Sequence, residues 1–186
     1  MSASATHDPT TGLRFRSADA TDVPAVVDLV QSAYRGEPSR IGWTTEADLI
    51  EGQRIDAAML QELLDRPRTV VLLAEAEELL ACCELSIESD PDIAYFGMFA
   101  VRPDRQTAGI GSRLLEHAER TAIDGGASTM RLVTIHLRSE LIAWYQRRGY
   151  EPTGTTHRFP YDEPRYGRPL RDDLTLVEFT KTLSSR

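Results

Sequence analysis

The chain contains 186 residues, of which 41% are hydrophobic and 27% are charged, a composition typical of a globular domain with a buried core. Its net charge of −8 argues against a nucleic-acid partner, because nucleic-acid-binding proteins carry a basic surface, and it mildly favours a cationic substrate. No stretch approaches the roughly 18 uninterrupted apolar residues of a membrane span, so we expect no membrane partner either.

Residues 1–11 are small and mostly polar, and they show no basic region followed by an apolar one. They predict a flexible N-terminal tail rather than a signal peptide, followed by a single domain over residues 12–186. Cys82 and Cys83 are neighbours in an apolar run, where successive strand residues point to opposite faces, so a disulfide between them would be strained. We expect both to be free thiols that pack in the core of a cytoplasmic protein.

The apolar periodicity of the remaining chain predicts alternating strands and helices. The first helix is predicted over the apolar residues from Val23 to Tyr34, with Thr21 as its N-cap. Residues 35–44 are predicted as a loop, and Thr45 to Asp48 resembles a capping box that opens a short helix. Further helices are predicted at residues 55–64, 109–123 and 140–148, and strands at residues 13–16, 69–74, 79–89, 95–101, 129–135, 150–156 and 174–182. This order predicts an α/β (α+β) protein with helices flanking a mixed sheet.

The Pro- and Arg-rich segment at residues 159–173 connects the last two predicted strands as a long loop. Loops of this length in compact domains are often functional. With Tyr161, Asp162, Arg165 and Tyr166, the segment is expected to close over a cleft or to contact a second subunit, which leaves a homodimer open.

A glycine-rich turn joins the predicted strand at residues 95–101 to the helix after it. Pro103 follows the strand, and Gly109 and Gly111 stand at the start of the helix. There the first backbone N–H groups have no intrahelical partner and the helix dipole is positive, so main chain alone can hold a phosphate. The turn lacks the lysine of a Walker A loop, and Leu114 replaces the third glycine of the dinucleotide fingerprint. Nucleotide hydrolysis and Rossmann-type binding are therefore disfavoured.

Two motifs of the sequence resemble those of the GNAT family of N-acetyltransferases. The first runs from Gln106 to Gly111 and is similar to the family signature Q/R-x-x-G-x-G/A, which binds the pyrophosphate of coenzyme A. The second runs from Leu141 to Tyr150 and resembles the family helix that ends in Tyr-x-x-x-Gly-Phe/Tyr, with Gly149 suited to the C-cap. Two motifs in the family's order make the resemblance specific.

The resemblance implies a GNAT-type acyl-CoA N-acyltransferase fold, whose mostly antiparallel sheet of about seven strands is splayed between strands 4 and 5. The opening lies between the strands that end near Val101 and Ile135, and it admits the pantetheine arm. The family uses acetyl-CoA as a cosubstrate and no metal. For this chain the implied coenzyme A contacts are Gln106, Thr107, Ala108, Gly109, Ile110, Gly111 and Ser112, with the main chain of Phe99, Ala100 and Val101 at a strand bulge.

The implied reaction moves the acetyl group to a primary amine of a small molecule or peptide by direct attack in a ternary complex. The site must deprotonate an ammonium, stabilise an oxyanion and protonate a leaving thiolate. Tyr145 matches the family tyrosine that donates to the sulfur, although its spacing also fits a core aromatic. The sequence leaves the base open between Glu84 and Tyr95 on neighbouring strands and His136, whose type titrates near neutrality. Arg138 stands where the family often carries Asn, so the contacts of that Asn are not expected here.

Acceptor choice is expected to depend on the segment between the first helix and the second strand. Trp43 is a candidate wall of the acceptor pocket, and Glu46, Asp48 and Asp56 are candidates for binding its ammonium. Tyr95 is a further candidate for binding the acceptor. Helix caps and a hydrophobic staple are alternative explanations of this segment. The alternative function is a non-catalytic acyl-CoA-binding sensor or interaction module, which would not need Tyr145.

Overall fold

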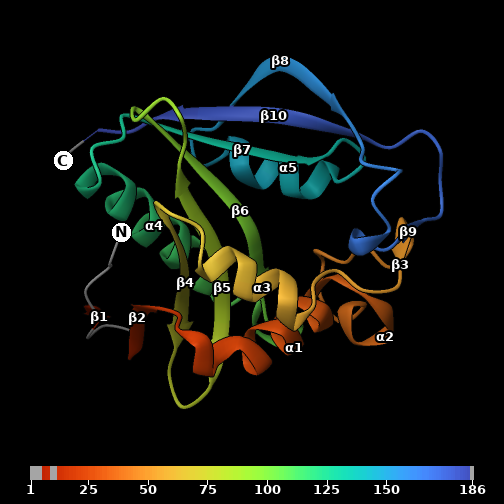
Figure 1. Cartoon of the computed structure of the whole chain (residues 1–186), viewed down its shortest axis with the longest axis horizontal. Coiled ribbons are helices and arrows are strands. Elements are labelled where there is room, and N and C mark those ends of the chain that lie inside the picture. The colour runs from red at the N-terminus through yellow and green to blue at the C-terminus, as the bar shows by residue number, and fades with distance from the viewer. Residues whose placement is uncertain (1–5, 9–11, 185–186) are drawn as a thin grey trace.

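The computed structural model describes residues 6–8 and 12–184 and is built around one mixed sheet of eight strands (Figure 1). The strands lie in the order β1-β2-β4-β5-β6-β7-β10-β8. All neighbours run antiparallel except β6 and β7, which run parallel. The strands are β1 (Thr6–Asp8), β2 (Leu13–Ser17), β4 (Thr69–Glu75), β5 (Leu79–Ile87), β6 (Ile93–Val101), β7 (Thr129–Ile135), β8 (Glu151–Arg158) and β10 (Thr175–Thr182). The predicted mixed, mostly antiparallel sheet is confirmed.

The eighth strand, β1, comes from the segment that the sequence predicts as a flexible tail. Thr6–Asp8 pairs antiparallel with Leu13 to Phe15 of β2, so this part of the predicted tail belongs to the sheet. The rest of that prediction, at residues 1–5 and 9–11, lies outside the described residues.

Helices cover both faces of the sheet. The helices are α1 (Val23–Tyr34), α2 (Gly36–Ser39), α3 (Ala57–Leu64), α4 (Ile110–Asp124) and α5 (Ser139–Gln146), with 3-10 turns at Ala20–Asp22, Pro103–Arg105 and Pro164–Tyr166. One core cluster joins α1 and α3 to one face, and a second joins α4 and α5 to the other (Figure 1). Cys82 packs in the first and Cys83 in the second, and both thiols are free and buried, as the alternation along a strand predicts.

Two predictions of helix starts are wrong. Asp19, not Thr21, caps the first helical segment, because its carboxylate accepts the Thr21 N–H at 2.8 Å while Asp22 reaches back to the Asp19 N–H. No helix begins at Thr45, whose hydroxyl accepts the Ala47 N–H in a two-residue turn.

The acidic member of the expected capping box at Thr45 has another partner. Asp48 forms an ion pair with Arg40 at 2.7 Å instead of returning to the backbone of Thr45. The helical turn in this region is α2, which lies within residues predicted as a loop.

The sheet opens between its two parallel strands. β6 pairs with β7 only from Ile93 to Tyr95, after which the strands diverge. On its other edge β6 carries a bulge, because Cys82 lies opposite Ala100 while Glu84 lies opposite Gly97. Met98 in the bulge has a φ of +45°, a left-handed conformation that is uncommon for a non-glycine residue. The predicted opening and the predicted bulge are both confirmed.

The long C-terminal loop is fastened to the segment before α3. Its strand β9 (Arg168–Pro169) pairs antiparallel with β3 (Ile50–Glu51), and the two lie side by side in Figure 1. Gly167, with a φ of +96°, allows the two strands to lie this close. A Cβ at this position would lie only 2.5 Å from the carbonyl oxygen of Glu51. The fastening holds Arg165 and Tyr166 over the opening of the sheet.

Candidate active site

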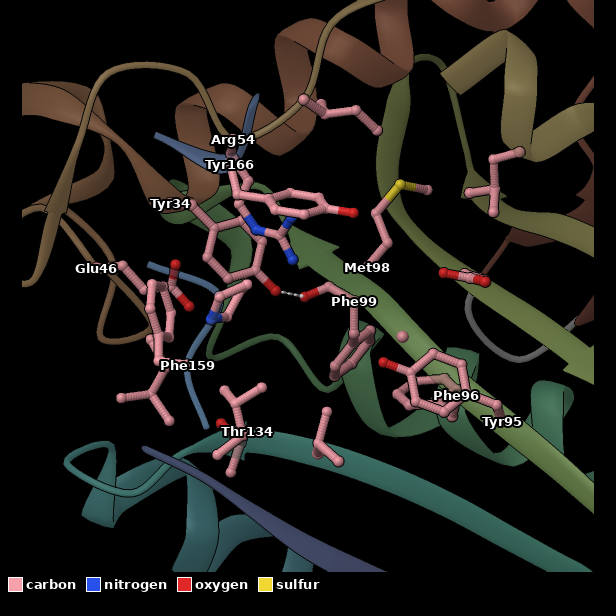
Figure 2. Close-up of a pocket in the computed structure, with 18 of the residues that line it drawn as sticks. Tyr34, Glu46, Arg54, Tyr95, Phe96, Met98, Phe99, Thr134, Phe159 and Tyr166 are labelled. Atoms are coloured by element: carbon pink, nitrogen blue, oxygen red, sulfur yellow. Dashed lines mark hydrogen bonds between the residues drawn. The ribbon is translucent and has the colours of Figure 1, made fainter. Parts of the chain in front are cut away.

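A cavity of about 770 Å³ lies at the opening between β6 and β7. In Figure 2, Met98 and Phe99 lie on the β6 side of this cavity, and Thr134 lies on β7. The remaining wall comes from α1, from α3 and the segment before it, and from the long loop. A smaller cavity of about 40 Å³ lies beside the glycine-rich turn.

The glycine-rich turn forms the start of α4. Gly109 is the N-cap residue, with a φ of +76°, and the Arg113 N–H donates back to its carbonyl at 3.2 Å. Nothing lies within 4 Å of the position that a Cβ of Gly109 would take, so this side of the turn is open. The main-chain amides before Arg113 have no intrahelical acceptor, so they are available to donate hydrogen bonds.

Gly111 is required for a different reason. A Cβ there would lie 3.1 Å from Cζ of Phe99 and 3.3 Å from Cγ2 of Val101, so the glycine lets α4 pack closely on β6. The two glycines of the motif thus do different work. The side of Gly109 is open, and Gly111 brings the helix against the strand.

Gln106 connects the turn to the segment before Glu46. Its Oε1 accepts the Trp43 N–H at 2.9 Å, and its Nε2 donates to Thr44 Oγ1 at 2.7 Å and to the Val101 carbonyl at 3.2 Å. Trp43 consequently lines the small cavity beside the turn, together with Gly109 and Ser112. Trp43 does not line the large cavity, and its role as a wall of the acceptor pocket stays a prediction.

Tyr145 projects from α5 onto the wall of the large cavity. Its ring packs edge-on against Trp144 and Tyr150, with centroids 5.2 and 5.6 Å apart. Its hydroxyl makes no hydrogen bond to any residue that the structure describes. Burial raises the pKa of Tyr145 well above its ordinary value, so the phenol keeps its proton. The residue is thus a core aromatic whose protonated phenol belongs to the cavity wall.

Glu84 and Tyr95 line the same cavity from β5 and β6. Gly97 makes room for them, because Glu84 Oε2 and the Tyr95 hydroxyl lie 3.2 and 3.1 Å from where its Cβ would be. Burial raises the pKa of Glu84, and Arg66, 3.6 Å away, opposes that rise only in part. A buried carboxylate with a raised pKa on a cavity wall can exchange protons nearer neutrality than an exposed one.

Glu46 is buried in the cavity wall between two arginines. Its oxygens lie 2.7 Å from Arg35 Nη1 and 2.9 Å from Arg138 Nη1. Burial alone would raise the pKa of Glu46, but Arg138, Arg54 and Arg35 together hold it below its ordinary value. The protein's own cations thus already neutralise this carboxylate, and the binding of an ammonium by Glu46 stays a prediction.

The other two carboxylates expected to bind an ammonium do not line the cavity. Asp48 is paired with Arg40 on the surface, and Asp56 is the N-cap of α3, where it accepts the Met59 N–H at 2.8 Å. Both carboxylates thus have structural partners, and the binding of an ammonium by either stays a prediction. His136 also lies off the cavity, next to the backbone of Thr175 at the start of β10.

The sequence did not point to two residues of the cavity, Tyr34 and Thr134, and it placed a third, Arg54, only within the segment expected to determine acceptor choice. Tyr34 of α1 donates its hydroxyl hydrogen bond to the Phe99 carbonyl in the bulge (Figure 2). The buried hydroxyl of Thr134 has no partner among the described residues. Arg54, half-buried, lies with its guanidinium 5.5 Å from the centre of the Tyr34 ring. Tyr34 and Thr134 lie in apolar patterns that indicate only core packing, so no local signal distinguishes them.

The described ranges contain no helix long and apolar enough to cross a membrane. In the same ranges no group of three or more His, Cys, Asp or Glu side chains is arranged to bind a metal ion.

The family model described as "Acetyltransferase (GNAT) family" matches residues 25–150 of the chain. Among curated proteins, the amino-acid acetyltransferase of Pseudomonas putida is 29% identical over 106 residues, which cover 56% of this chain but only 24% of that protein. The chain thus spans less than a quarter of the length of this relative.

Solved structures of the family share the fold of this chain. The ribosomal-protein-S18-alanine N-acetyltransferase of Escherichia coli aligns with a TM-score of 0.68 and 19% identity, covering 94% of this chain and 96% of that one. A GNAT family acetyltransferase from Elizabethkingia anophelis, solved with acetyl-CoA bound, aligns with a TM-score of 0.67 and 18% identity, covering 93% and 99%.

The pairing of Glu46 predicts a large difference between two similar substitutions. Glu46→Gln leaves the buried guanidinium of Arg35 without its carboxylate and should lower the free energy of unfolding by about 3–5 kcal/mol. Asp48→Asn breaks an exposed pair with Arg40 and should leave that free energy nearly unchanged. Urea unfolding at pH 7 measures both. Equal effects would mean that Glu46 is not a structural ion-pair partner.

Proposed function

The chain belongs to the GNAT family of acetyltransferases, and from that membership we propose that it transfers the acetyl group of acetyl-CoA to a primary amine of a small molecule or peptide. The reaction proceeds by direct attack in a ternary complex. The observation that carries the proposal is that one cavity, at the opening between β6 and β7, is lined by two groups suited to proton transfer, Tyr145 and Glu84.

Acetyl-CoA would supply an acetyl group activated as a thioester. We assign its pyrophosphate to the main chain of the turn from Gln106 to Ser112, where the side of Gly109 is open. Its pantetheine arm is assigned to the open edge of β6 at Phe99 to Val101. The unpartnered hydroxyl of Thr134 across the opening supports a polar ligand there.

Glu84 and Tyr145 have opposite tasks in this proposal. Glu84 accepts a proton from the acceptor's ammonium, so that the nitrogen lone pair can form the new C–N bond. Tyr145 donates its proton to the sulfur as the C–S bond breaks. As the tetrahedral intermediate collapses, the nitrogen loses its second proton to solvent. The net reaction converts the ammonium and the thioester into an amide, a free thiol and one released proton, and solvent returns the proton from Glu84 to Tyr145.

A non-catalytic acyl-CoA-binding module is the alternative. The buried carboxylate of Glu84 argues for the enzyme, because a pure binder gains nothing from a group whose ionisation is disfavoured by burial. The amino-acid acetyltransferase of Pseudomonas putida supports an amine acceptor of low molecular weight. A cytoplasmic location, supported by the free cysteines, and a homodimer remain part of the proposal.

The open side of Gly109 predicts where a new charge blocks acetyl-CoA. Gly109→Asp keeps a residue that tolerates the left-handed conformation and places a carboxylate where the pyrophosphate would bind. Calorimetric affinity for acetyl-CoA should fall by about tenfold or more, the scale of one lost charge-assisted contact. Gly126→Asp is the matched control, since Gly126 has a φ of +95° and equally open surroundings beyond the other end of α4. Equal affinities for both variants would remove the turn from the binding site.

The raised pKa of Glu84 predicts a pH dependence. A base must be ionised, so kcat should fall as the pH is lowered through a pKa above the ordinary 4.5 of a glutamate. Glu84→Gln should lower kcat about 10²–10⁴-fold and abolish this dependence.

Stability should change in the opposite sense from activity. Since the folded state binds the Glu84 proton more tightly than the unfolded state, ionisation of Glu84 costs stability, and the cost grows as the pH rises through that pKa. Glu84→Gln should therefore keep or raise Tm at pH 7. Glu62→Gln, which alters an exposed ion pair at the cavity rim, is the control and should keep the wild-type pH profile. An unchanged profile in Glu84→Gln would exclude Glu84 as the base.

The free hydroxyl of Tyr145 predicts a loss of rate without a loss of packing. Tyr145→Phe keeps the ring contacts and removes the proton donor, so kcat should fall about 10²-fold, the low end for a general acid because a thiol is a tolerable leaving group. Tyr150→Phe is the matched control: its hydroxyl bonds Glu119 at 3.0 Å and does not line the cavity. That variant should lose stability but keep kcat. Wild-type kcat in a folded Tyr145→Phe protein would leave solvent as the donor.

A further inference from the structure

We infer that the amine acceptor carries a carboxylate and that the guanidinium of Arg54 binds it. The inference rests on the proposed function, because it names the substrate class of the same cavity. It reverses the expectation from the overall acidic composition, which favours a cationic substrate.

Arg54 differs from the other arginines of the cavity in having no carboxylate within ion-pair distance, although its charge helps to lower the pKa of Glu46. Six arginines of the wall lie within ion-pair distance of a glutamate or aspartate: Arg35, Arg66, Arg131, Arg138, Arg158 and Arg165. Among the residues that the structure describes, the guanidinium of Arg54 makes no hydrogen bond or ion pair, and it lies over the face of the Tyr34 ring. Its hydrogen-bond donors are therefore free to bind an anion.

The main chain that carries Arg54 is held in place from α1. Gln31 accepts the Arg54 N–H at 2.9 Å through its Oε1 and donates to the Gly52 carbonyl at 3.1 Å through its Nε2. The neighbouring Gln53 donates to the Arg165 carbonyl at 3.1 Å. In Figure 2, the side chains of Arg54, Tyr34 and Tyr166 converge on the same part of the cavity. Because hydrogen bonds already fix the main chain at Arg54, less conformational entropy is lost when its side chain binds a ligand.

The charge of the cavity is opposite to that of the chain. Its wall contains seven arginines and four glutamates, whereas the whole chain has a net charge of −8. One of the four, Glu84, is also disfavoured in its ionised form by burial. Such a wall attracts an anionic group on the acceptor and disfavours an acceptor that carries a second ammonium besides the reacting amine.

A carboxylate fits this arrangement better than a phosphate. Arg54 supplies a single planar fork, which matches the two oxygens of a carboxylate in bidentate contact. The other six guanidiniums of the wall already serve protein carboxylates, so little positive charge is left for a dianion. The acceptor class is thus an amino acid or a peptide whose carboxylate lies within reach of its amine.

The test compares L-amino acids with their α-carboxamides, which keep the amine and the side chain but lose the negative charge. Arg54→Gln should raise KM for an amino acid about tenfold or more, as expected for a lost hydrogen-bonded charge, and change KM for its carboxamide less than threefold. Arg54→Lys keeps the charge but not the fork and should fall between wild type and Arg54→Gln. Affinity for acetyl-CoA should not change in either variant.

Arg158→Gln is the matched control, because it removes one positive charge from the same wall at an exposed, already paired residue. The inference is wrong if Arg158→Gln raises KM as much as Arg54→Gln does, or if Arg54→Gln raises KM equally for amino acids and for their carboxamides. In either case the wall acts only through its overall positive charge. The inference is equally wrong if wild type prefers the carboxamides, or if phosphoethanolamine alone shows the dependence on Arg54.

A binding measurement separates this inference from the proposed function. Amino acids are titrated calorimetrically into the protein saturated with coenzyme A, which carries no acetyl group and allows no turnover. Carboxylate-dependent binding that requires Arg54, without turnover in the presence of acetyl-CoA, would support the anion site and refute the enzyme. Turnover without any dependence on Arg54 would support the enzyme and refute the anion site.

Discussion

The separation of β6 from β7 after Tyr95 is the constraint on which the rest of the site depends. Two parallel strands that stay paired would leave no opening, and their backbone groups would bond each other rather than a ligand. Because α4 follows β6 and α5 follows β7, the glycine-rich turn and Tyr145 are brought to this one opening. The bulge at Met98 and the bond from Tyr34 to the Phe99 carbonyl hold β6 in its divergent course.

The buried charges organise the other side of the cavity. Glu46 connects α1, through Arg35, to the turn before α5, through Arg138, which also donates to the Thr44 carbonyl at 2.6 Å. Gln106 binds the same segment from the glycine-rich turn. Removing two charges from water is costly, and such pairs often contribute little net stability, so a role in positioning the segment fits the arrangement better than one in stability alone.

The sequence predicts those features of the fold that depend on local apolar patterns and on the family motifs. The central strands, α4 and α5 follow from apolar periodicity, and the opposite burial of Cys82 and Cys83 follows from strand alternation. The family motifs anticipate the opening of the sheet. The roles of Glu46 and Trp43 could not be predicted, because they depend on Arg138 and Gln106, which are distant in the sequence. The local sequence around a carboxylate such as Glu46 does not identify the distant arginine that pairs with it in the fold.

The central claim is that the opening between β6 and β7 is the meeting point of acetyl-CoA and the acceptor. A crystal structure of the chain with coenzyme A tests it most directly. We expect the pyrophosphate on the main chain of Gly109 to Ser112 and the pantetheine between Phe99 and Thr134, with its sulfur facing Tyr145. Coenzyme A bound elsewhere, or with its sulfur directed away from the cavity that holds Tyr145 and Glu84, would contradict the account.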